Sequence, residues 1–141
     1  MKHRNLFCGA LLGAAVLCSV PAATAQTPCP LPGQKPMQVV HLFFGRAIPG
    51  RAPLTNREWS RFASEVLTPN FPDGFTAYDA DGQWMNDKTQ RIVRERSKVV
   101  LIAADPNADI AKHVAAVTDA YRRQFRQLSV GVISETACAA F

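Results

Sequence analysis

The order of the hydrophobic segments constrains the fold of this 141-residue chain more than any other feature. Four segments are short and rich in β-branched or aromatic residues, which is typical of β-strands: residues 37–44, 75–85, 91–104 and 129–133. Two longer segments between them, residues 55–67 and 106–126, repeat their apolar residues every three or four positions, as amphipathic helices do. The predicted order is therefore strand, helix, strand, strand, helix, strand.

The first helix has the clearest start and end signals. Thr55 and Glu58 have the spacing of a capping box, in which each residue accepts a hydrogen bond from the backbone of the other. The apolar stripe that follows has helical spacing: Trp59, Phe62, Ala63, Val66 and Leu67. Pro69 is predicted to end this helix, and Asp105-Pro106 to begin the second one.

This order of elements is the split βαβ pattern of ferredoxin-like folds, which have a four-stranded antiparallel sheet and two helices on one face. The sequence therefore predicts an α+β fold of the ferredoxin-like βαββαβ type. A single domain is expected at residues 37–141, preceded by an extended, proline-rich lead-in at residues 26–36.

Residues 1–25 have the pattern of an export signal, with a basic start, an apolar run and a small-x-small motif at the end. Cleavage predicts a periplasmic or secreted protein without a stable membrane anchor; a retained membrane or lipid anchor is the alternative. Loss of Lys2 and Arg4 lowers the Lys and Arg count from 16 to 14 against 11 acidic residues, so the net charge falls from +5 to +3. This small excess does not indicate a nucleic-acid partner.

Two of the four cysteines, Cys8 and Cys18, lie in the predicted signal. Cys29 and Cys138 remain, near the two ends of the mature chain, and an oxidising compartment favours a disulfide between them. Two free or redox-active thiols are the alternative, although no Cys-x-x-Cys motif is present.

Metal and cofactor sites are not indicated. The stretch Asp79-Ala-Asp-Gly82 lacks the glutamate that closes a calcium-binding EF-hand loop, so it is interpreted as a bend in the second strand. Outside the signal, only His41 and His113 are available as histidine ligands. We therefore predict neither a metal nor a cofactor, and the sequence contains no nucleophile signature.

The third strand carries alternating charges. Arg94, Arg96 and Lys98 point to one face by the period of two, and we expect this to be the open face of the sheet. Together with Arg46 they are candidates for binding a small anionic ligand; the alternative is a solvated charged face. Glu95 would then lie on the helix-covered face, paired with an arginine or serving a function.

Two classes of function remain open. The first is a ligand-binding or self-associating module that uses the open sheet face, with Phe43 and Trp84 as apolar contacts in a homo-oligomer. The second is a small periplasmic enzyme of the dimeric α+β-barrel type, in which Glu95 or His41 acts as acid or base and the arginines bind an anionic substrate.

Several segments, taken together, resemble domain-of-unknown-function family 3574, whose members are small exported bacterial proteins: "FFGRAIPG", "EWSRF", "TPNFPDGFTAYDADGQW" and "IVRERSKVVLI". The resemblance covers residues 39–141. It implies export and a compact α+β domain, with no established activity, substrate or cofactor. It also implies family-typical residues, none with a catalytic role: Gly45, Arg46, Trp59, Phe71, Pro72, Asp73, Gly74, Thr76, Gly82, Trp84, Glu95, Ser97 and Lys98.

Overall fold

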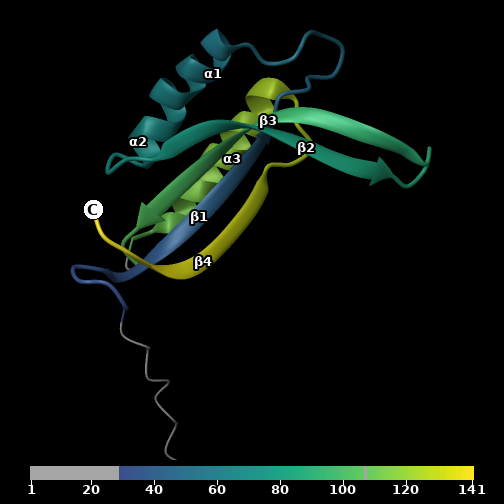
Figure 1. Ribbon diagram of the computed structural model, residues 1–141. Coiled ribbons are helices and arrows are strands. Elements are labelled where there is room, and N and C mark those ends of the chain that lie inside the picture. The colour runs from purple at the N-terminus through teal and green to yellow at the C-terminus, as the bar shows by residue number, and fades with distance from the viewer. Residues whose placement is uncertain (1–28, 107) are drawn as a thin grey trace, which may run out of the picture.

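The computed structural model describes residues 29–106 and 108–141, so the predicted export signal lies outside the described residues. The elements, in chain order, are β1 (Lys35–Gly45), α1 (Asn56–Phe62), η1 (Ala63–Leu67), α2 (Thr68–Asn70), β2 (Thr76–Asn86), β3 (Arg91–Ala104), α3 (Ile110–Phe125) and β4 (Gly131–Ala139) (Figure 1). Within the described residues, no helix is both long and apolar enough to cross a membrane.

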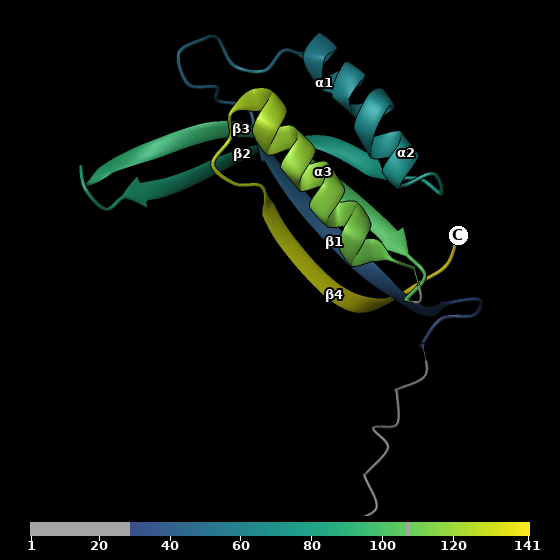
Figure 2. The same ribbon diagram turned by 180° about the vertical axis from the view of Figure 1, so that it is seen from behind.

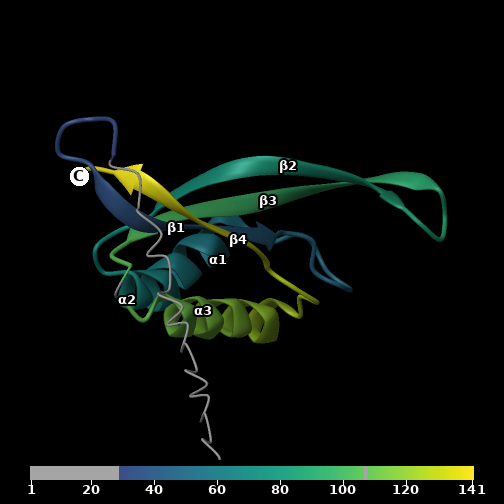
Figure 3. The same ribbon diagram turned by 90° about the horizontal axis from the view of Figure 1, so that it is seen from below.

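The four strands form one sheet in the order β2-β3-β1-β4, and each neighbouring pair is antiparallel. The helices lie together on one face of this sheet, which is clear from behind (Figure 2) and from below (Figure 3). The predicted α+β class, with a four-stranded antiparallel sheet and two helical segments, is confirmed.

The core lies between the helices and the sheet. Every second residue of β1 points into it, namely Val40, Leu42 and Phe44. The Phe44 ring lies 4.7 Å from the Tyr121 ring and 5.4 Å from the Trp59 ring, measured between centroids. These tilted and edge-on contacts add specific geometry to the hydrophobic burial that holds helices and sheet together.

The predicted capping box is present at the start of α1, since Thr55 and Glu58 bond to each other's backbone N–H groups. The sequence predicts that this helix ends before Pro69, but the structure shows that it continues. The π-helical turn η1 comes first and Pro69 lies in the final turn, α2. In η1 the Thr68 N–H donates to Ala63 O, five residues back. Such a turn changes the usual i to i−4 pattern just where proline lacks a donor.

The second helix, α3, begins at Ile110, after the predicted start at Pro106. The physical reason is a hydrogen bond from Ala108 N to Asp105 O, 2.9 Å long, which closes a turn ahead of the helix. The start signal in the sequence therefore marks this turn.

β3 has the predicted bounds, whereas β1 and β4 are longer than the sequence indicates and β2 is more regular. The pairing of β2 with β3 is unbroken from Thr76↔Leu101 to Asn86↔Arg91, so the predicted bend at Asp81-Gly82 does not interrupt it. At the other end of the sheet, β4 extends to Ala139 instead of ending at residue 133.

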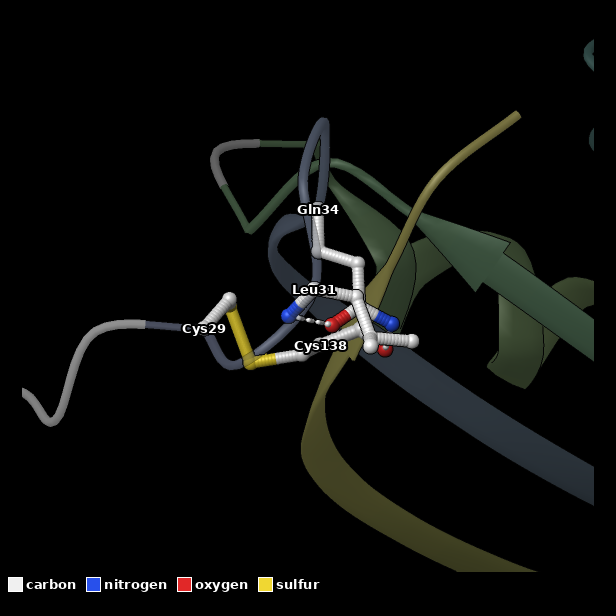
Figure 4. The surroundings of a disulfide bond; sticks show 4 residues. All are labelled: Cys29, Leu31, Gln34 and Cys138. Carbon is white, nitrogen blue, oxygen red and sulfur yellow. Dashed lines mark hydrogen bonds between the residues drawn. A yellow bond between two sulfur atoms is a disulfide. The ribbon is translucent and has the colours of Figure 1, made fainter.

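This extension of β4 places Cys138 opposite Pro36, beside the lead-in. The predicted disulfide between Cys29 and Cys138 is confirmed, with a Cα–Cα distance of 5.6 Å (Figure 4). Gln34 reinforces the junction, because its amide nitrogen donates to Cys138 O while its amide oxygen accepts from Leu31 N.

One part of the sheet extends past the rest. The ladder between β1 and β3 ends at Gly45↔Ser97, but β2 and β3 remain paired as far as Asn86↔Arg91. We call this projecting hairpin, residues 82–95, the arm; it reaches beyond the helices in Figures 1 and 3.

Candidate functional site

A pocket of about 510 Å³ lies on the open face of the sheet, where the arm leaves β1. It is bounded by β1, the base of the arm and the segment between α3 and β4. Its lining residues are Phe43, Gly45, Ala47, Pro49, Gly82, Trp84, Glu95, Ser97, Arg126, Gln127, Leu128, Ser129 and Gly131.

Glu95 is the acidic residue of this pocket. Its Oε1 atom accepts a hydrogen bond of 2.9 Å from the backbone N–H of Ala47. Within the described part of the chain, no donor lies within hydrogen-bonding distance of Oε2. The carboxylate is thus held through one oxygen, and its second oxygen is available to a ligand.

Gly45 makes room for this carboxylate. A Cβ atom at position 45 would lie 2.6 Å from Glu95 Oε1, closer than real Cβ contacts come. The Gly45 carbonyl is in turn fixed from the core side by the Tyr121 hydroxyl, which donates to it at 2.8 Å. Burial raises the pKa of Tyr121, so the phenol keeps the proton that it donates.

Two aromatic side chains form the apolar walls. Trp84 is 47% exposed and Phe43 is 37% exposed, so both present ring surface to the pocket. Gly131 lies close against Phe43, since a Cβ there would be 3.2 Å from Phe43 Cβ. Glycine in a strand often marks such a close approach, and here the missing side chain leaves this edge of the pocket open.

The third side of the pocket is the segment after α3. Arg126 ends the helix in a left-handed conformation, with φ of 51°. Its guanidinium donates to Pro49 O at 2.8 Å, and the Gln127 amide donates to Ala47 O. These bonds hold the segment against the loop after β1 that also carries the donor to Glu95.

The predicted faces of the charged residues in β3 are wrong, because Arg94, Arg96 and Lys98 lie on the side of the helices and Glu95 lies on the open side. Lys98 is opposite Phe44 in the ladder, so it faces the helices, and Glu95 faces the open side. Lys98 Nζ lies 2.9 Å from Asp79 Oδ1 and 6.0 Å from the Trp59 ring centroid. The sequence does not determine the phase of this alternation, because β3 ends in the uninterrupted apolar run Val99-Val-Leu-Ile102, which fits either phase.

Arg46 has the same orientation as Lys98. Its guanidinium donates through Nε and Nη2 to Leu54 O, and through Nη1 to Asp79 Oδ1 at 3.4 Å. Lys98, which hydrogen-bonds to Asp79, and then Arg46 hold the pKa of that carboxyl below its usual range. The two mostly buried cations are therefore committed to Asp79 and the backbone, and Glu95 is held by Ala47.

The remaining predicted residues lie apart from the pocket. Arg94 and Arg96 are exposed on the other side of the arm, where they line a recess of about 290 Å³ with Arg46, Ala47, Pro53 and Glu95. His41 lies on the open face between Leu101 and Ile133, outside the lining of the pocket. Of the predicted site residues, the structure thus brings together Trp84 and Glu95.

Sequence reasoning missed the residues after α3, namely Arg126, Gln127 and Leu128, together with Ala47 and Gly131. The one available signal was the glycine in the predicted strand "SVGVI". The other residues come from loops that only the folded sheet brings to the base of the arm.

Fold and site define a small α+β protein with a pocket on its open sheet face. The chain belongs to the family described as protein of unknown function DUF3574, whose model matches residues 40–141 and so includes every residue of the pocket. Positions that the resemblance implies to be family-typical also gather there, namely Gly45, Gly82, Trp84, Glu95 and Ser97.

Among curated proteins, none matches this chain significantly. Two solved structures of a phage SAM lyase share its fold. The complex with S-methyl-5′-thioadenosine is 15% identical, with a TM-score of 0.55, and the match covers 74% of this chain and 90% of that one. The apo state is 16% identical, with a TM-score of 0.53, over 82% and 97% of the two chains.

Proposed function

We propose that this protein is an exported ligand-binding module whose pocket on the open sheet face takes a small organic molecule. The observation that carries the proposal is the carboxylate of Glu95, held by Ala47 N at 2.9 Å with its second oxygen available, beside the rings of Trp84 and Phe43. Pockets that combine apolar walls with a few fixed polar groups are typical of small-molecule sites.

The side chains favour a particular class of ligand. A carboxylate attracts a cation or accepts from hydroxyl and amino groups, and an indole face attracts a cation as well. The pocket thus suits a molecule with a flat apolar part and a positively charged or donor-rich part. The phage SAM lyase, bound in its structure to S-methyl-5′-thioadenosine, supplies one probe of this class.

The test compares two probes by isothermal titration calorimetry. S-methyl-5′-thioadenosine carries the flat base and the donor groups, and SAM adds a sulfonium and an amino-acid group, which together give it a net positive charge. We expect both to bind, SAM more tightly, and Glu95→Gln to remove most of that preference because the neutral amide no longer attracts the cation.

Glu135→Gln is the matched control. Glu135 lies on the same face, opposite Val39, but at the far end of β1 from the pocket. It should leave both affinities unchanged. If neither probe binds the wild-type protein, this ligand class is wrong; if Glu135→Gln acts like Glu95→Gln, the carboxylate in the pocket is not the recognition group.

Catalysis is the second candidate function. A carboxylate that lines a pocket and is held through one oxygen is suited to act as general base. His41 lies outside the lining, so Glu95 is the residue that we assign to this role. Loss of turnover in Glu95→Gln with unchanged probe binding would support an enzyme over a binding module.

An anionic ligand is a proposal for the smaller recess on the other side of the arm. Support comes from the exposed guanidinium groups of Arg94 and Arg96 at its rim.

For the fold, we propose the ferredoxin-like type, supported by the strand order β2-β3-β1-β4 with helical segments after β1 and β3. For location, we propose the periplasm or the exterior, supported by the disulfide and the signal-like start.

A further inference from the structure

Apart from its base, where Ala47 N donates to Glu95, the arm has no other strand or helix of the described chain beside it. Beyond Gly45↔Ser97, β3 has no ladder with β1, and β2 is the edge strand of the sheet throughout its length. The described helices lie under the sheet but not under the arm (Figure 3). A two-stranded hairpin alone is marginally stable in water, so an arm of this length needs a surface to pack on.

Apolar side chains cover both faces of the arm. Trp84 and Val93 pair across the strands on the front, the side of the pocket. Met85 and Ile92 pair on the back, and they are 50% and 49% exposed. A hairpin that only projects into solvent would need apolar residues on neither face, and residues of this kind on both faces point to two separate contacts.

Two charged residues of the arm also lack an oppositely charged partner among the described residues. Glu95 on the front has no cationic partner among the described residues, and Arg94 on the back has no acidic one. Neighbouring residues of a strand point to opposite faces, so these two side chains cannot pair within one chain. Between two copies, the back of one arm and the front of another are complementary in charge as well as in apolar character.

We propose that the occupant of the front of the arm is a second copy of this chain. The back of its arm covers the pocket, with Ile92 and Met85 against Trp84, and Arg94 of the second copy faces Glu95. Back-to-front contact is heterologous, and its repetition around a rotation axis closes a ring in which every pocket is completed by a neighbour. This inference concerns assembly; Arg94 of the second copy and a cationic ligand would compete for the same carboxylate, so the ligand is tested separately on a variant that does not assemble.

The first experiment changes the back of the arm and leaves the pocket lining intact. We expect the mature wild-type chain to show the mass of an oligomer in multi-angle light scattering, and Ile92→Lys to shift it to the monomer mass. Val132→Lys is the matched control, since Val132 is a similarly exposed residue (47%) on β4, the opposite edge strand. Circular dichroism checks that both variants are folded.

The second experiment tests the charge pair by mixing. Arg94→Gln and Glu95→Gln should each weaken association about tenfold or more, since each leaves one charge of the interface unpaired. An equal mixture of the two variants restores contacts in which an intact Arg94 meets an intact Glu95. The mixture should therefore assemble more tightly than either variant alone, which native mass spectrometry detects as mixed oligomers.

Three results would overturn the proposal. These are a monomeric wild-type protein, an oligomer that persists in folded Ile92→Lys, and a mixture that assembles no better than its components. The last two would place any oligomer interface elsewhere. Calorimetry with the probes on folded Ile92→Lys, whose pocket lining is intact, tests the ligand pocket without the second copy, so failure of the assembly and failure of the ligand pocket are distinguishable.

Discussion

Gly45 and Glu95 depend on each other at the residue scale. The Glu95 carboxylate occupies the space that any side chain at position 45 would need, 2.6 Å from the Cβ position. We expect Gly45→Ala to displace Glu95 from Ala47 N and, because the end of a flexible side chain can move aside, to lower the free energy of unfolding only by the lost hydrogen bond, about 0.5–1.5 kcal/mol. Urea denaturation measures this loss, and calorimetry with S-methyl-5′-thioadenosine measures the change in the pocket.

Gly82→Ala is the internal control for that substitution. Gly82 lines the same pocket, but an added Cβ would meet only Glu95 O, at an ordinary 3.6 Å. The substitution should therefore have little effect on stability. Equal losses in the two variants would show that the pocket, and not the specific contact with the carboxylate, is sensitive to an extra methyl group.

Tyr121 supports the same site from the core. Its hydroxyl donates to Gly45 O at 2.8 Å, and the residue is fully buried. Tyr121→Phe removes the donor and leaves a carbonyl unsatisfied, so we expect a loss of about 1–2 kcal/mol in the free energy of unfolding. Phe125→Leu, a change of packing in the same aromatic cluster, is a useful comparison. It should destabilise the fold without weakening probe binding, whereas Tyr121→Phe should do both.

At the scale of the element, α1 depends on Glu58. Hydrogen bonds from the backbone and then the hydroxyl of Thr55, followed by the bond from Arg51, lower the pKa of Glu58 from 4.5 to about 2. A lowered pKa in the folded state means that the ionised carboxylate stabilises the fold above about pH 4.5. This contribution is lost as the pH falls toward 2.

Glu58→Gln tests this pH dependence. The variant should be less stable than the wild type at neutral pH, and the difference should shrink between pH 4.5 and about pH 2 as the wild-type carboxylate is protonated. Urea denaturation at a series of pH values measures both curves. A difference that stays constant with pH would show that the amide and the carboxylate differ in geometry and not in charge.

Local patterns explain which elements could be predicted from the sequence. The stripe from Trp59 to Leu67 and the capping box at Thr55 each lie within one segment, and both are present in the structure. The orientation of β3 could not be predicted in the same way, because it depends on which of its apolar residues meet α3 and α1. Val100 and Ile102 do so, and the choice moves Glu95 to the open face.

The site was predicted only in part for a related reason. Trp84 and Glu95 are single residues with unusual chemistry, so the sequence draws attention to them. The donor at Ala47 and the wall at residues 126–129 are ordinary loop positions, brought together by the pairing of β1 with both of its neighbours. Nothing in their local sequence marks them.

For the whole molecule, the disulfide and the pocket are at opposite ends of the sheet. Cys138 is opposite Pro36 at the start of β1, whereas Gly45 ends that strand, about 30 Å away at the usual rise per residue. The disulfide restrains the lead-in and the end of β4. It contributes no residue to the pocket or to the arm.

Reduction of the disulfide therefore has a specific expected outcome. The bond joins residues 109 positions apart, and a loop of that length stabilises the fold by about 4–5 kcal/mol in the chain-entropy model. We expect the double variant Cys29→Ser/Cys138→Ser to lose most of this free energy in urea denaturation, and reductant to have the same effect on the wild type but none on the variant. Because the pocket lies at the other end of β1, the folded fraction of the variant should bind S-methyl-5′-thioadenosine as the wild type does.

A variant that keeps its stability would show that β4 pairs with β1 strongly enough to hold the two ends without the bond. A folded variant with weaker probe binding would instead show that the sheet transmits strain along β1 from the disulfide to Gly45.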